Sequence, residues 1–159
     1  MILYYLRHGE KEDHPISYFK PLTPKGKKQA RMIGKFLKGM HFNIAFVSSY
    51  VRTRETFLEL PITYDKLELS SDFGELKERS RRAGDFLRKL KALPENYVCL
   101  MVGHGNFQRA LVAKIMGIRY EKVQKIIFDN AGISKYWITK DDERIIFLNF
   151  TYDLCKGNP

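Results

Sequence analysis

Two histidines in this sequence follow directly on apolar runs. His8 lies within the segment RHGE, after the run MILYYL, and His104 lies within GHG, after the run YVCLMV. A neutral imidazole nitrogen is a nucleophile that can attack phosphorus. The adjacent glycines allow backbone amides to approach a bound anion closely. The pair therefore indicates a candidate catalytic site.

Arginines accompany both histidines. Arg7 precedes His8, and Arg52 and Arg54 are alternatives for a second cation after the segment SSY. A guanidinium group stays charged and offers planar, paired donors to a phosphoryl group. Two such groups and a second imidazole compensate the charge of an attacked phosphate without a metal ion. With a bound dianion, we expect His8 to be neutral and His104 to be protonated.

Secondary-structure signals show how these residues are positioned. Apolar runs predict strands, and apolar residues at helical spacing predict helices. Residues 62–69 are ambiguous, with a short strand as the interpretation offered. The expected strands are residues 1–6, 42–47 and 97–102, with a closing hairpin of 133–139 and 145–150; the expected helices are 24–39, 51–60, about 74–93 and about 109–116.

The alternation of strands and helices predicts an α/β fold. We expect a three-layer α/β/α sandwich with a mostly parallel central sheet and an antiparallel edge formed by the last two strands. Ligands of such sheets bind at the carboxyl ends of the strands. The segments with Arg7 and His8, with Arg52 and with His104 all begin there, so they are expected to share one crevice.

Length and composition limit the class of protein. The 159 residues, 44% hydrophobic and 29% charged, are typical of one soluble domain spanning 1–159. Apolar runs are too short for a membrane span, and the two cysteines fit free thiols in a reducing compartment, so we expect a cytoplasmic location without membrane association. The net charge of +10 is compatible with anionic substrates, nucleic acid or a lysine-rich surface.

Four motifs in order along the chain resemble those of the histidine phosphatase superfamily, also called the phosphoglycerate mutase-like superfamily. They are RHGE (7–10), LTPKG followed by QA (22–30), SSYVRTRET (48–56) and GHGNFQRAL (103–111). The resemblance implies a phosphoglycerate mutase-like fold, with His8 as the nucleophile. It implies a phosphate pocket of Arg7, Arg52 and His104, selects Arg52 over Arg54, and adds Gly105 as a substrate-binding residue.

The resemblance leaves the proton donor and one substrate loop open. Members of the family carry a glutamate as general acid, for which Glu75 and Glu68 are the candidates here, and Glu68 is also a candidate substrate-binding residue. The family's asparagine beyond RHGE is absent, and the segment KEDH (11–14) stands in its place. Substrate contacts of that asparagine are therefore not carried over.

The short chain leaves little room for a lid over the pocket, which favours hydrolysis because water can enter. The layout is similar to that of small protein phosphohistidine phosphatases. We therefore expect a metal- and cofactor-independent phosphatase acting on phosphomonoesters or phosphohistidine, with a phosphorylated small molecule or a phosphohistidine protein as partner. The alternatives are a mutase-type phosphoryl transferase and a non-catalytic module that binds a phosphorylated ligand or nucleic acid. Nucleic acid is not expected, because the aromatic residues fall mainly in core strands.

Overall fold

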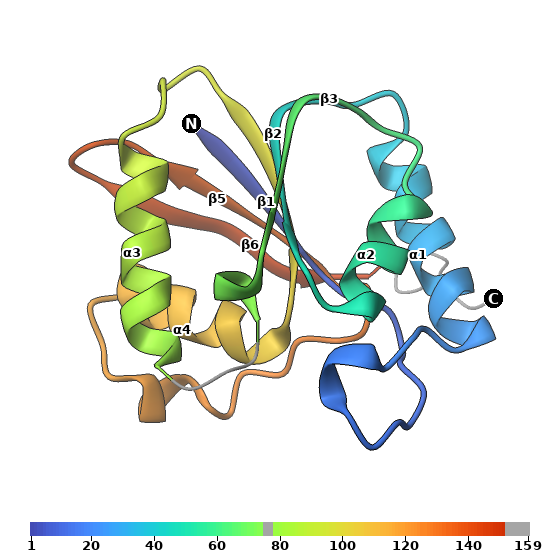
Figure 1. The fold of residues 1–159 in the computed structure, drawn as a ribbon. Helices are drawn as coiled ribbons and strands as arrows, with labels where there is room; N and C mark the ends of the chain where they lie inside the picture. Colours follow the sequence, from blue (N-terminus) through green and yellow to red (C-terminus); the bar gives the residue numbers. More distant parts are fainter. Residues whose placement is uncertain (75–77, 152–159) are drawn as a thin grey trace, which may run out of the picture.

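The computed structural model describes residues 1–74 and 78–151, in which six strands form one mixed sheet (Figure 1). The strands are β1 (Ile2–Arg7), β2 (His41–Ser48), β3 (Thr63–Ser70), β4 (Val98–Gly103), β5 (Ile133–Ile138) and β6 (Glu143–Phe150). The helices are α1 (Pro24–Leu37), α2 (Val51–Leu58), α3 (Arg79–Lys91) and α4 (Gly105–Ile115), with 3-10 turns η1 (Ser17–Phe19), η2 (Ser71–Phe73) and η3 (Tyr120–Val123).

The sheet has the order β3-β2-β4-β1-β5-β6. Strands β3, β2, β4 and β1 are parallel, whereas β5 pairs with β1, and β6 with β5, in antiparallel fashion. The expected mostly parallel sheet with an antiparallel edge is thereby confirmed. The carboxyl ends of β1, β2 and β4 lie side by side, and this is where the histidine and arginine segments begin.

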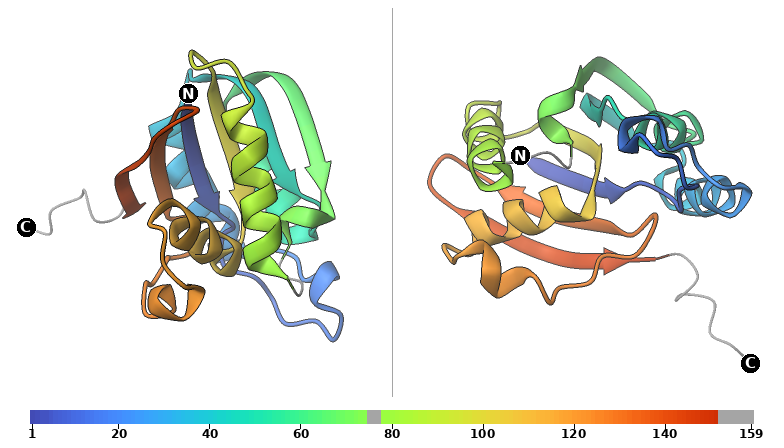
Figure 2. Two further views of the ribbon diagram at one scale, coloured as in Figure 1. Left: turned by 90° about the vertical axis from the view of Figure 1, so that its left-hand side faces the viewer. Right: turned by 60° about the horizontal axis from the view of Figure 1, so that its bottom comes forward.

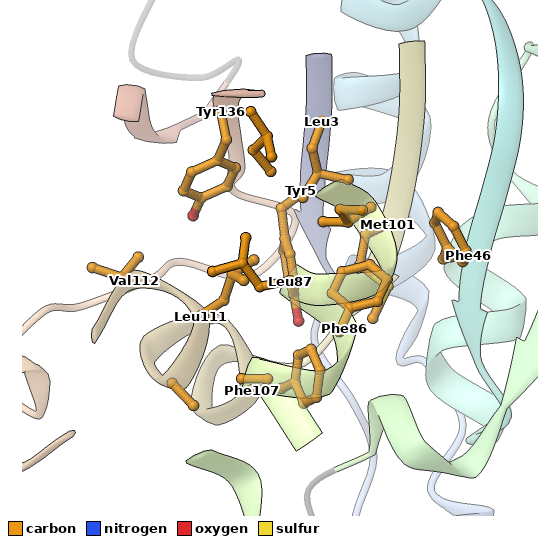
Figure 3. Close-up of a cluster of buried hydrophobic side chains, with 14 of the residues drawn as sticks. Leu3, Tyr5, Phe46, Phe86, Leu87, Met101, Phe107, Leu111, Val112 and Tyr136 are labelled. Atoms are coloured by element: carbon orange, nitrogen blue, oxygen red, sulfur yellow. The ribbon is translucent and has the colours of Figure 1, made fainter. Parts of the chain in front are cut away.

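Helices cover both faces of the sheet, which confirms the three-layer sandwich (Figure 2). Helix α1 packs through Ile33 and Leu37 into one hydrophobic cluster. Helices α3 and α4 pack into a second, larger cluster on the other face, rich in aromatic rings (Figure 3). None of the described helices has the length and apolar character that a membrane crossing requires.

Two helices begin at other residues than the sequence predicts, and the ambiguous segment contains a strand. Helix α4, expected from about Arg109, begins at Gly105, directly after His104. The helix expected from about Gly74 begins only at Arg79, because Gly74 has an extended backbone and its N–H closes the η2 turn on the Ser71 carbonyl. The ambiguous residues 62–69 contain the edge strand β3, whose residues are mostly exposed and so lack the apolar alternation that signals a strand.

The start of α1 fixes the chain after β1. Thr23 caps the helix by accepting the Gly26 N–H at 2.9 Å, and Pro24 occupies the first turn. A Cβ on Gly26 would lie 2.0 Å from the Glu10 carbonyl oxygen, and one on Gly9 would lie 2.4 Å from the Gly26 oxygen. Only glycines allow this approach, which holds the segment that contains His8 against the helix.

Candidate active site

The imidazoles of His8 and His104 meet above the carboxyl ends of β1 and β4, with 5.2 Å between ring centroids. Both residues are buried, with exposed fractions of 2% and 0%. The main chain at His8 is bonded on both sides: its N–H donates to the Gly103 carbonyl, and its own carbonyl accepts from the Ala131 N–H. The backbone therefore sets the position of this histidine.

Hydrogen bonds determine which nitrogen of His8 carries a lone pair. Nδ1 lies 2.7 Å from the Gly9 carbonyl oxygen, which only accepts, so Nδ1 holds the proton and donates. Nε2 lies 3.2 Å from Nε of Arg52, which only donates, so Nε2 is the acceptor. The lone pair of the ring is thus on Nε2, where it accepts the hydrogen bond from Arg52.

Burial keeps His8 neutral. It lowers the pKa of His8 from its ordinary value of 6.5 to about 3, and the nearby cations Arg52, Arg7 and Lys11 act in the same direction, against the opposing hydrogen bond to Gly9. Near neutral pH the imidazole is therefore unprotonated, as a nucleophile must be.

Arg52, in the first turn of α2, joins the two histidines. Its side chain is fully buried, and Nε donates to His8 while Nη2 lies 3.2 Å from Nδ1 of His104. Nη1 donates to the carbonyl oxygen of Ser17 in η1, at 2.7 Å. Arg54, the alternative considered from the sequence, is exposed. The structure thus brings together Arg52, and not Arg54, with both histidines.

His104 has the opposite tautomer to His8. Because Arg52 donates to Nδ1, the proton of the neutral ring is on Nε2, which donates to Oγ of Ser48 at 2.9 Å. Burial, followed by the charges of the surrounding side chains, lowers the pKa of His104 well below its ordinary value. The free site thus holds a neutral His104, and the protonated form expected from the sequence needs a bound dianion to raise that pKa.

Arg7 and Gly105 lie beside each other at the amino end of α4. Nη1 of Arg7 donates to the Phe128 carbonyl oxygen. A Cβ on Gly105 would make ordinary contact with Nε of Arg7, at 3.5 Å. The charge of Arg7 reaches both histidines, since it contributes to lowering the pKa of each. These two residues therefore border the histidine pair on the side of α4.

Of the two acid candidates, the structure describes only Glu68. Glu68, on β3, pairs with Lys89 of α3, and both line a charged cavity of about 190 Å³ between β3 and α3. The Glu68 carboxylate thus accepts from Lys89 on the α3 side of the sheet. Glu75 lies outside the described residues. Arg82 holds the chain just before it by donating to the Asp72 and Gly74 carbonyls.

Four contacts of the site were not predicted from the sequence. Ser48 accepts from His104, and the ring of Tyr50 packs edge-on to His104 at 4.9 Å and lies under the Arg52 guanidinium group at 4.7 Å. Both residues follow the apolar run of β2, a signal that could have identified them. The contact of Arg52 with Ser17 uses a backbone carbonyl, and no residue type marks such a contact in advance.

The arrangement has the parts needed to bind and attack a tetrahedral anion. The lone pair on Nε2 of His8 is buried and oriented, and Nε of Arg52 donates to it. Preorganised donors in a buried site stabilise developing charge without reorganising. The site can therefore receive a phosphoryl group on His8.

Known proteins share this family and fold. A model of the histidine phosphatase superfamily (branch 1) matches residues 3–77 and 73–151. No curated protein sequence matches the chain.

Among solved structures, the protein histidine phosphatase SixA complexed with tungstate superposes with a TM-score of 0.79 at 19% identity, covering 98% of this chain and 100% of that one. A phosphoserine phosphatase from Entamoeba histolytica in complex with 3-phosphoglyceric acid gives a TM-score of 0.79 at 18% identity, covering 94% and 97% of the two chains. The alpha-ribazole phosphatase from Shigella flexneri gives 0.76 at 19% identity, covering 94% and 96%.

Proposed function

Because the chain belongs to the histidine phosphatase superfamily (branch 1), we propose that it is a phosphatase with a covalent phosphohistidine intermediate on His8. One observation carries the proposal. The Gly9 carbonyl accepts from Nδ1 of His8, so that the lone pair is on Nε2, next to Arg52 at a buried position. Once a phosphoryl group replaces the Arg52 hydrogen bond to Nε2, this lone pair can attack phosphorus in line, with the guanidinium group beside it.

In the first step, the lone pair on Nε2 forms a bond to phosphorus, and the bond from phosphorus to the leaving group breaks. Arg52 and Arg7 stabilise the negative charge on the equatorial oxygens, and His104 completes the pocket. In the second step, water attacks the phosphohistidine, the P–N bond breaks, and inorganic phosphate leaves with His8 restored. The charge compensation comes from protein groups, so we propose a reaction that needs no metal ion or cofactor.

The substrates that we propose are phosphomonoesters and phosphohistidine on proteins. The similar solved structures carry the names of phosphatases for both kinds of substrate. An alkoxide leaving group needs a proton donor, for which Glu75 is our first candidate and Glu68 the second. The imidazole that leaves phosphohistidine has less need of a strong acid.

Hydrolysis of p-nitrophenyl phosphate by wild type, His8→Ala and His41→Ala tests the proposal. His41 is a matched control, because it is an exposed histidine at the opposite end of β2, paired with Asp65. We expect His8→Ala to lose at least about a thousandfold in kcat and His41→Ala to keep wild-type kcat. Equal turnover by the two variants would contradict a nucleophilic His8. Salt-sensitive binding of nucleic acid without turnover by the wild type would support a binding module instead.

A further inference from the structure

The hydroxyl of Tyr5 is bonded to the main chain of His104 from beneath the site. Tyr5 lies on β1 with its side chain fully buried among α3 and α4 residues (Figure 3). Its oxygen accepts the His104 N–H at 3.1 Å, and its proton is donated to the His104 carbonyl, also at 3.1 Å. One hydroxyl thus satisfies both backbone groups of the second histidine.

Regular secondary structure provides only part of this restraint. Strand β4 ends at Gly103, one residue before His104, and α4 begins at Gly105. His104 is the N-cap residue of α4 without a side-chain cap, and its carbonyl accepts from the Gln108 N–H as the first helical bond. Its own N–H is buried, and a buried N–H requires an acceptor. Tyr5 supplies that acceptor.

The backbone position of His104 determines where its imidazole lies. The ring reaches Nη2 of Arg52 at 3.2 Å and Oγ of Ser48 at 2.9 Å, and small displacements weaken both bonds. Resting on the phosphatase function proposed above, we infer that Tyr5 is a positioning residue that holds His104 in register with Arg52. It acts through the His104 main chain and does not touch the substrate.

Gly103 makes this arrangement possible. A Cβ at position 103 would lie 2.4 Å from the Tyr5 hydroxyl oxygen, 3.0 Å from its Cζ and 3.1 Å from Cε of Met101. All three atoms belong to side chains, so a larger residue at position 103 would displace the hydroxyl without disturbing a backbone contact. Tyr5 and Gly103 therefore form a matched pair: the Tyr5 hydroxyl leaves no room for a side chain at position 103, and the glycine leaves room for the hydroxyl.

Tyr5→Phe and Tyr136→Phe separate positioning from stability. Tyr136 is a second fully buried tyrosine of the same cluster (Figure 3), and its hydroxyl contacts Gln108 instead of His104. Both variants lose a buried hydroxyl bond, so we expect similar decreases in melting temperature. With p-nitrophenyl phosphate, we expect kcat of Tyr5→Phe to fall about 10- to 100-fold, with KM within about threefold of wild type, whereas Tyr136→Phe keeps wild-type kcat. Equal kcat for the two variants would overturn the inference.

A double-mutant cycle gives a second test, and its Gly103→Ala arm in the wild type applies even if Tyr5→Phe does not fold, since a wild-type kcat there would contradict the inference. Gly103→Ala in the wild type displaces the Tyr5 hydroxyl, so we expect kcat to fall about tenfold or more. In the Tyr5→Phe background there is no hydroxyl to displace, and the same substitution should lower kcat by less than about threefold. Additive losses would contradict a matched pair.

Imidazole nitrogen NMR of ¹⁵N-histidine-labelled protein distinguishes failure of this inference from failure of the proposed function. We expect the His104 ring signals to shift in Tyr5→Phe and to stay unchanged in Tyr136→Phe, whether or not the protein hydrolyses phosphate. Shifted signals in a wild type without turnover would support Tyr5 positioning and reject the phosphatase function. Unshifted His104 signals in an active Tyr5→Phe variant would reject the positioning role alone.

Discussion

Replacing Arg52 with alanine removes a group that contacts both histidines at once. The side chain is fully buried and donates to Nε2 of His8 and to Nδ1 of His104. Its loss takes away the nearest guanidinium charge from the nitrogen that we propose as the nucleophile. It also removes the hydrogen bond from Arg52 to Nδ1 of His104, which fixes the tautomer of that ring.

The size of the effect follows from these contacts. Losing one preorganised donor to a developing anion costs about 10²–10³ in kcat, and losing a cationic arginine in phosphoryl transfer costs about 10³–10⁵. For Arg52→Ala we expect about 10³–10⁴ in kcat, or about 4–5.5 kcal/mol of transition-state stabilisation. Arg52→Lys keeps the charge but loses the planar fork, so we expect it to recover about tenfold of that loss.

Steady-state hydrolysis of p-nitrophenyl phosphate measures this effect, with Arg54→Ala as the matched control. Arg54 is an exposed arginine two residues along the same helix, and its removal should leave kcat unchanged. Circular dichroism establishes that each variant is folded. The reasoning is refuted if folded Arg52→Ala stays within tenfold of wild-type kcat, or if Arg54→Ala loses as much as Arg52→Ala.

Three further predictions concern protonation, the second histidine and the glycine contact. The unfolded chain protonates His8 below pH 6.5 while the folded protein resists until about pH 3, so stability falls on acidification through that window. Urea unfolding between pH 6 and 4 should show a contribution of about 1.4 kcal/mol per pH unit from this residue. His8→Ala should have a correspondingly shallower slope, and an equal slope would contradict a neutral buried imidazole. Ser48→Ala leaves Nε2–H of His104 without its acceptor, so kcat should fall about tenfold; unchanged kinetics would show that this bond is dispensable. Gly26→Ala should lower the free energy of unfolding by about 3 kcal/mol, because the new Cβ overlaps backbone atoms. Gly84→Ala, in the middle of α3, should raise the free energy of unfolding by about 0.5–1 kcal/mol, because the nearest atom to its Cβ lies 3.5 Å away. Similar unfolding curves for both variants would refute the close-approach argument.

The sequence predicted that His8, Arg52 and His104 lie close together, and this prediction did not require the order of the strands in the sheet. Apolar runs ended at polar segments, and parallel strands bring their carboxyl ends to one edge of a sheet. The helices followed from apolar spacing, but two of their starts did not. Helix α3 begins late because of the 3-10 turn before it, and α4 begins at Gly105, before the first residue that the apolar spacing marks.

Three other features of the structure could not be predicted from residue types or their spacing. Strand β3 is exposed along most of its length, so its pairing with β2 depends on the backbone and not on a burial pattern. The contact of Arg52 with the Ser17 carbonyl depends on the path of a loop. Tyr5 was readable as a core residue of β1, but its bond to His104 joins residues 99 positions apart and required the sheet register.

The covalent intermediate is the central claim, and direct trapping tests it. Wild type and His8→Ala are mixed with a ³²P-labelled phosphomonoester and quenched in alkali, which preserves phosphohistidine, before the labelled peptide is mapped. We predict label on the peptide that contains His8, on Nε2 as identified by the ³¹P chemical shift of the unlabelled phosphoenzyme, and no label in His8→Ala. Turnover by a wild type that never carries label on His8, or label that persists in His8→Ala, would contradict the account.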